Sequence, residues 1–119
     1  MAYGAKLRSI RLSKEMNLRD LALRTDIDIA YLSRVERETM NPPQDEELLD
    51  SINSALELSS TEARSMKDLA AVDNKRMPKD VAQGVAKISG FPLFLRTVSN
   101  KNLTPEKLKE LTDFINENY

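Results

Sequence analysis

The chain has 119 residues, and 18 Lys and Arg residues nearly balance 19 Asp and Glu residues, so its formal net charge is −1. It contains neither Cys nor His, which removes disulfides, thiolate metal sites and the commonest general base. No apolar run approaches the roughly 18 residues of a membrane span, and residues 1–12 are too polar for a secretory signal. We therefore expect a cytoplasmic protein without enzymatic activity, metal, cofactor or membrane contact.

The charges are unevenly distributed along the chain. Residues 1–40 carry eight Lys or Arg against six Asp or Glu, residues 41–74 carry two against eight, and residues 75–119 carry eight against five. The acidic charge is thus concentrated in the middle block. The overall balance therefore does not exclude a nucleic acid as a partner of the remaining parts.

Residues 17–36 hold the most informative pattern, which predicts two short helices joined by a tight turn. Apolar residues follow helical spacing on both sides of the turn, namely Leu18, Leu21, Ala22, Ile27, Leu32 and Val35. The small side chain of Ala22 allows the second helix to lie steeply against the first, as in a helix-turn-helix. Asn17 is placed to cap the first helix, and Asp28 the second.

Two more helices are expected before residue 74. A Pro-Pro start signal precedes residues 44–58, whose expected apolar face consists of Leu48, Leu49, Ile52 and Leu56. Residues 59–62 offer a cap for the next helix, whose inward-facing residues are Ala63, Met66, Leu69 and Ala70. The polar, unpatterned residues 74–77 then predict a linker between a domain over residues 1–73 and an extension over residues 78–119.

The extension predicts about three further helices. A first helical stripe consists of Val81, Val85 and Ile88, and a second segment covers residues 91–98. Thr104 and Pro105 open a last helix, whose apolar face consists of Leu108, Leu111 and Ile115. Because β-branched runs are short and interrupted, no strand is expected and the fold class is all-α. The extension is expected to pack on the first domain, on a partner subunit, or on both.

These features resemble the Cro/repressor-type helix-turn-helix regulators, also called the xenobiotic-response-element type. The resemblance covers about residues 3–58 and rests on Leu7, Ile10 and Arg11, on Leu21 and Ala22, on the run from Tyr31 to Glu36, and on Asn41 with Pro42. Family members usually have Gly where this chain has Asp26 in the turn and Glu38 after the second helix. Asp tolerates a left-handed backbone better than most residues, and Glu less well. The resemblance implies a five-helix repressor-like DNA-binding domain.

The resemblance also implies the roles of individual residues, with the helix over about residues 28–37 in the major groove. The base-reading positions match Ile29, Ala30, Ser33 and Arg34. Arg34 is the strongest of these, because Arg can bind guanine through two hydrogen bonds. Residues placed to contact the DNA backbone are Asn17, Arg19, Tyr31, Arg37 and Thr39. Tyr31 equally suits the edge of the core, and Arg11 with Glu36 is expected to form a structural pair between helices.

The function implied is a sequence-specific, double-stranded DNA-binding transcriptional regulator, most simply a repressor, that binds operator DNA as a homodimer. Members of this class generally bind two half-sites, so two copies must be held together. The apolar residues expected to form this interface are Val81, Val85, Ile88, Phe91, Phe94, Leu95, Leu108, Leu111 and Ile115. The alternative is an antitoxin or adaptor whose C-terminal helices bind a partner protein.

Overall fold

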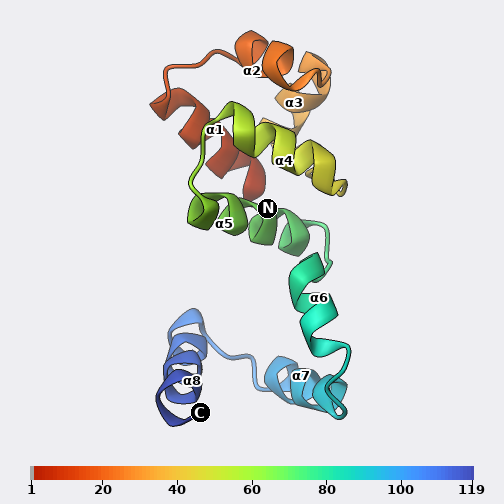
Figure 1. Cartoon of the computed structure of the whole chain (residues 1–119), viewed down its shortest axis with the longest axis vertical. Helices are drawn as coiled ribbons and strands as arrows, with labels where there is room; N and C mark the ends of the chain where they lie inside the picture. Colours follow the sequence, from red (N-terminus) through yellow and green to blue (C-terminus); the bar gives the residue numbers. More distant parts are fainter. Residues whose placement is uncertain (1) are drawn as a thin grey trace. The chain divides into compact units, whose positions relative to one another are not determined.

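The structure, a computed structural model, describes residues 2–119. Eight helices and no strand occur among these residues (Figure 1), which confirms the all-α prediction. In chain order they are α1 (Tyr3–Ser13), α2 (Leu18–Thr25), α3 (Ile29–Glu36), α4 (Glu46–Ala55), α5 (Ser60–Asp73), α6 (Lys79–Val85), α7 (Phe91–Asn100) and α8 (Pro105–Asn118). The chain divides into two compact units, the first ending at Lys79 and the second being Asp80–Tyr119. The irregular segment between α5 and α6 covers residues 74–78.

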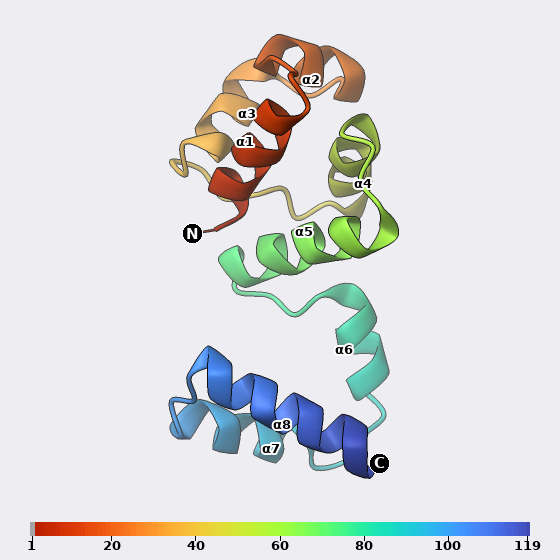
Figure 2. The ribbon, with the colours of Figure 1, turned by 90° about the vertical axis from the view of Figure 1, so that its left-hand side faces the viewer.

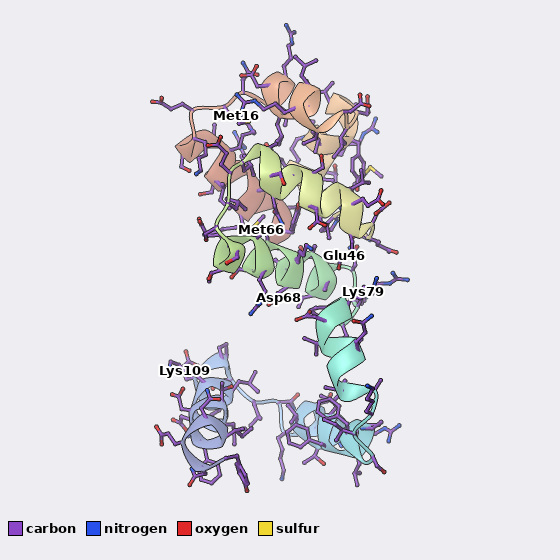
Figure 3. All side chains as sticks on the ribbon, viewed as in Figure 1. Met16, Glu46, Met66, Asp68, Lys79 and Lys109 are labelled. Carbon is purple, nitrogen blue, oxygen red and sulfur yellow. The ribbon has the colours of Figure 1, made fainter. Side chains whose placement is uncertain are left out.

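All of the helices α1 to α5 contribute to one hydrophobic core in the first unit. Its largest fully buried side chains are Tyr3, Leu7, Leu21, Leu32, Val35, Ile52, Leu56 and Met66. α1 packs on α3 and α5, α2 packs on α3 and α4, and α4 packs on α5 (Figure 2). In Figure 3, Met66 of α5 points into this unit, whereas Asp68 on the opposite side of the helix points outward. The period of the apolar residues therefore matches the buried faces of these helices.

The predicted inner face of α4 is wrong at one residue. Leu48 is 37% exposed, whereas Leu49 is 6% exposed. Consecutive residues of a helix are rotated by about 100°, and the buried face of α4 runs through Leu49, Ile52 and Asn53. Asn53 lies next to Ile52, and its side-chain amide donates a hydrogen bond to the carbonyl of Ala63 at 3.4 Å. Leu48 is therefore turned toward solvent.

The starts of α2 and α3 are fixed by side-chain caps. The Asn17 side chain accepts a hydrogen bond from the Asp20 amide at 2.8 Å, and the Asp28 carboxylate accepts one from the Tyr31 amide at 3.1 Å. Between the helices, Asp26 has φ 56° and ψ 33°, the left-handed conformation. Both caps predicted from the sequence are therefore made, and Asp26 adopts the left-handed conformation, which Asp tolerates better than most residues.

The N-terminus of α1 is capped by side chains from distant parts of the chain. Asp73, at the end of α5, accepts hydrogen bonds from the amides of Ala2 at 2.9 Å and Tyr3 at 2.8 Å. Glu38, which follows α3, accepts one from the amide of Ala5 at 3.4 Å. Both carboxylates are favoured there, because the first amides of a helix lack partners and carry partial positive charge. The capping contacts therefore join α1, α3 and α5 at one place.

Gly4 allows this junction to be close. A Cβ atom at residue 4 would overlap the carbonyl oxygen of Val35 and would lie 3.1 Å from the Cγ atom of Glu38. The backbone of α3 ends at this point, and Glu38 holds a left-handed conformation with φ 62°. Any side chain at residue 4 would therefore push α1 away from the end of α3.

We predict that Gly4→Ala lowers the free energy of unfolding by about 1–3 kcal/mol, as expected for overpacking. Urea denaturation followed by circular dichroism measures the loss. Gly84→Ala is the matched control, because a Cβ atom at Gly84 in α6 would meet nothing within 4 Å, and Ala favours a helix over Gly. An unchanged stability of Gly4→Ala would contradict the close approach of α1 and α3.

The second unit has no buried residue. α7 and α8 lie in it, with the part of α6 that follows Lys79, and every side chain from Asp80 to Tyr119 is exposed or half-buried. Its local structure is nonetheless regular: Thr104 caps α8 by accepting a hydrogen bond from the Lys107 amide at 3.2 Å. Apolar residues of this unit therefore remain accessible on its helices.

The predicted stripe of Val81, Val85 and Ile88 is wrong at Ile88. α6 ends at Val85, and the Ile88 amide then donates to the Val85 carbonyl at 3.0 Å in a turn. Gly90 has φ 84° and starts α7 from the left-handed conformation, which Gly adopts at little cost. Ile88 therefore lies in the connection between α6 and α7, outside the helix.

Candidate nucleic-acid interface

α3 has one face in the core and one face in solvent. Leu32, Val35 and Glu36 are buried, and they attach the helix to its neighbours. Among the four residues expected to read bases, Ile29, Ala30 and Arg34 are exposed, whereas Ser33 is half-buried. The structure therefore places Ile29, Ala30 and Arg34 on the outer side of the same short helix.

The turn before α3 is held by buried residues on both sides. Only residues 26–28 separate α2 from α3, and Leu21 and Ile27 are buried against the core. The hydroxyl of Thr25, at the end of α2, donates a hydrogen bond to the Leu21 carbonyl at 2.8 Å. The position of α3 relative to α2 is thus set by packing rather than by the turn alone.

Arg11 of α1 and Glu36 of α3 form a buried ion pair. Arg11 Nε lies 2.7 Å from Glu36 Oε2, and Arg11 Nη2 donates to Glu36 Oε1 at 2.8 Å. The remaining nitrogen, Nη1, donates to the Met16 carbonyl at 2.8 Å. The two charged side chains are only 9% and 5% exposed, and the hydrogen bond to Glu36 raises the pKa of Arg11. The pair therefore joins α1, α3 and the segment leading into α2.

We predict that Glu36→Gln lowers the free energy of unfolding by about 3–5 kcal/mol, because it leaves the buried guanidinium without its counter-charge. In the double variant Arg11→Met with Glu36→Gln, part of this loss is recovered, and the cycle of urea denaturation experiments gives a coupling energy of about 1 kcal/mol or more.

The control is Lys67→Met, which breaks the ion pairs of Lys67 with Glu46 and Asp50, whose side chains are 42% and 60% exposed. Because those groups are accessible to solvent, this change should cost about 1 kcal/mol or less. Additive effects of the Arg11 and Glu36 changes would contradict a coupled pair.

Three of the five residues expected at the DNA backbone already use their polar groups in the fold. Asn17 caps α2, and the hydroxyl of Thr39 donates to the Arg34 carbonyl at 3.2 Å at the end of α3. The hydroxyl of half-buried Tyr31 donates to the Asn41 carbonyl at 3.4 Å, and burial raises its pKa. Tyr31 therefore lies at the edge of the core, one of the two positions that the sequence allowed.

The other two residues present accessible guanidinium groups. Arg19 is exposed on α2, and Arg37 is exposed directly after α3. Arg37 uses only Nε within the fold, which donates to the Ser33 carbonyl at 3.3 Å. Both side chains are therefore available to an anionic partner.

A depression lies beside α3 where three helices meet. It encloses about 220 Å³ and is lined by Arg8, Arg11, Leu18, Ser33, Glu36 and Arg37. Arg8 was not among the residues expected from the sequence. Its spacing of three from Arg11 on α1 is the sequence signal that could have indicated it, because residues i and i+3 share a helix face.

The residues expected at a dimer or partner interface are accessible in the second unit. Val85 and Phe91 are half-buried. The remaining residues are between 38% and 53% exposed, namely Val81, Ile88, Phe94, Leu95, Leu108, Leu111 and Ile115. The rings of Phe91 and Phe94 lie 5.7 Å apart. None of these side chains is enclosed by the unit that carries it.

Among residues 2–119, acidic side chains do not gather in a group that could hold a metal ion. Over the same residues, every helix is too short or too polar to cross a membrane. The chain matches no family model, and no curated protein or solved structure shows significant similarity to it.

Proposed function

We propose that this chain is a sequence-specific, double-stranded DNA-binding transcriptional regulator, a repressor in its simplest form, that inserts α3 into the major groove. The observation that carries the proposal is the two-sided character of α3. Leu32, Val35 and Glu36 hold its inner face in the core, while its outer face presents Arg34 with the apolar Ile29 and Ala30. Arg binds guanine through two hydrogen bonds, and small apolar side chains contact the thymine methyl group.

We predict that Arg34→Ala weakens binding to a duplex selected from a random pool by about 1–3 kcal/mol, because it removes a contact to a base edge. Binding to an unrelated duplex should change far less. Fluorescence anisotropy with both duplexes, at the same salt concentration, measures the two affinities.

Arg64→Ala is the matched control for charge, because Arg64 is an exposed Arg on α5, away from α3. Its effect on both duplexes should be small. If Arg34→Ala lost the same affinity for both duplexes, Arg34 would contact only the DNA backbone and would not read a base.

The second unit is proposed to pair two copies of the chain. A single α3 reads too few base pairs for useful specificity, and paired half-sites require a dimer. Residues 80–119 contain five Lys or Arg and five Asp or Glu, so net charge does not oppose association of two copies. Their exposed apolar residues would supply the buried centre of the interface.

We predict that Leu111→Lys converts a full-length dimer into a monomer, because it places a charge in the apolar centre of the interface. Leu111 is 44% exposed, so the substitution should leave the fold of the chain intact. Sedimentation velocity measures the mass of the full chain and of the variant.

Glu117→Gln is the control, since it changes the net charge by the same amount on a different face of α8. A wild-type monomer at tens of micromolar, on the order of the affinity of a weak interface, would contradict self-association.

The same accessible apolar residues favour a second candidate function, an antitoxin or adaptor that binds a different protein. The two functions differ in what the isolated chain does. An adaptor would be insoluble alone and soluble when produced with its partner, because the partner would cover the apolar residues. A regulator of the proposed kind would be a soluble dimer that selects a DNA sequence.

A further inference from the structure

The depression beside α3 contains cationic groups that the fold does not neutralise. Arg8 and Arg37 are exposed, and neither forms an ion pair with a carboxylate of the described residues 2–119. The one carboxylate in the lining, that of Glu36, has both oxygens bound to Arg11. The lining therefore holds three guanidinium groups and one paired carboxylate, and its net charge is positive.

The geometry of the depression suits an anion rather than an apolar ligand. Leu18 is the one apolar residue of its lining, and Ser33 adds a hydroxyl to it. Leu18 is also the first residue of α2, and the first turn of a helix carries partial positive charge. Guanidinium groups bind phosphate oxygens through charge-assisted hydrogen bonds.

The position of the depression connects it to α3. Ser33 and Arg37 belong to α3 and to its C-terminal cap, and Ser33 directly precedes the exposed Arg34. A helix in the major groove is flanked on both sides by sugar-phosphate backbone. A cationic depression at the side of that helix is therefore placed near a phosphate of the bound duplex.

The geometry points to Arg8 and Arg37 as the two residues whose guanidinium groups together bind one backbone phosphate of DNA in this depression. This inference rests on the proposed DNA-binding function and adds Arg8 of α1 to the interface. Arg11 is not one of the two binding residues, because Glu36 and Met16 take one N–H from each of its three nitrogens and its side chain is only 9% exposed. It is a positioning residue that holds α1, and with it Arg8, beside α3.

The test uses the full chain and two duplexes, the selected site and an unrelated sequence. Arg8→Ala should weaken binding to both by a similar factor, about three- to tenfold, because a phosphate contact carries no sequence information. The slope of log K against log salt concentration should fall by about one. Arg64→Ala, the matched exposed Arg on α5, should change neither quantity, and thermal unfolding of both variants should match the wild type.

A second set of duplexes identifies the phosphate. In each duplex one phosphate is replaced by a neutral methylphosphonate. At the phosphate that Arg8 and Arg37 bind, the wild-type protein should lose affinity, and Arg8→Ala should lose less, since only the contact of Arg37 remains to be removed. A titration with inorganic phosphate, followed by NMR, tests whether the depression also binds free phosphate or only a phosphate of the DNA backbone.

The outcomes distinguish this inference from the proposed function. If the wild type selects no duplex, the proposed function fails, and the inference fails with it. If the wild type binds DNA but Arg8→Ala behaves like Arg64→Ala, only the inference is overturned. A loss confined to the selected duplex would make Arg8 a base-reading residue, and tight binding of inorganic phosphate without an effect on DNA would make the depression a small-anion site. Either result contradicts the assignment.

Discussion

The buried ion pair between Arg11 and Glu36 is the interaction on which the arrangement of the first unit depends. One guanidinium group bonds both oxygens of Glu36 and the Met16 carbonyl, so it joins α1, α3 and the approach to α2. A buried pair of this kind adds little stability over an apolar contact of the same size, but its geometry admits few alternatives. Together with the buried Leu32 and Val35, it holds α3 in one orientation. The exposure of Arg34 and the position of Arg8 both follow from that orientation.

The junction of α1, α3 and α5 is the second constraint, and it explains an unusual residue. Glu38 holds a left-handed conformation with φ 62°, which Gly would adopt at lower cost. Its carboxylate, however, accepts a hydrogen bond from the Ala5 amide, and Gly could not supply this acceptor. The start of α1 lacks its own side-chain cap, so the contacts of Glu38 and Asp73 compensate for it. Strain in the loop after α3 is thus balanced by capping of α1.

The two units differ in how far their helices bury apolar side chains. In the first unit, helices α1 to α5 enclose a core with side chains such as Leu7, Leu32 and Ile52 at 0% exposure. In the second unit, no residue from Asp80 to Tyr119 is buried, although α7 and α8 have well-formed starts at Gly90 and Thr104. Helices as short as these are only marginally stable through local hydrogen bonds alone, and their apolar side chains gain stability only when another surface covers them. This contrast is the physical reason for proposing different partners for the two units.

Local patterns in the sequence were sufficient to predict the helices, the caps at Asn17 and Asp28 and most of the core, because apolar spacing and capping depend on residues a few positions apart. The resemblance to a known family supplied the pairing of Arg11 with Glu36, which spacing alone would not indicate. Only the tertiary structure decided where α4 turns Leu48, that Asp73 caps α1, and that Arg8 lies with Arg37 in one depression. Each of these depends on side chains from different helices meeting in space. The period of a single helix cannot specify which distant residue lies opposite it.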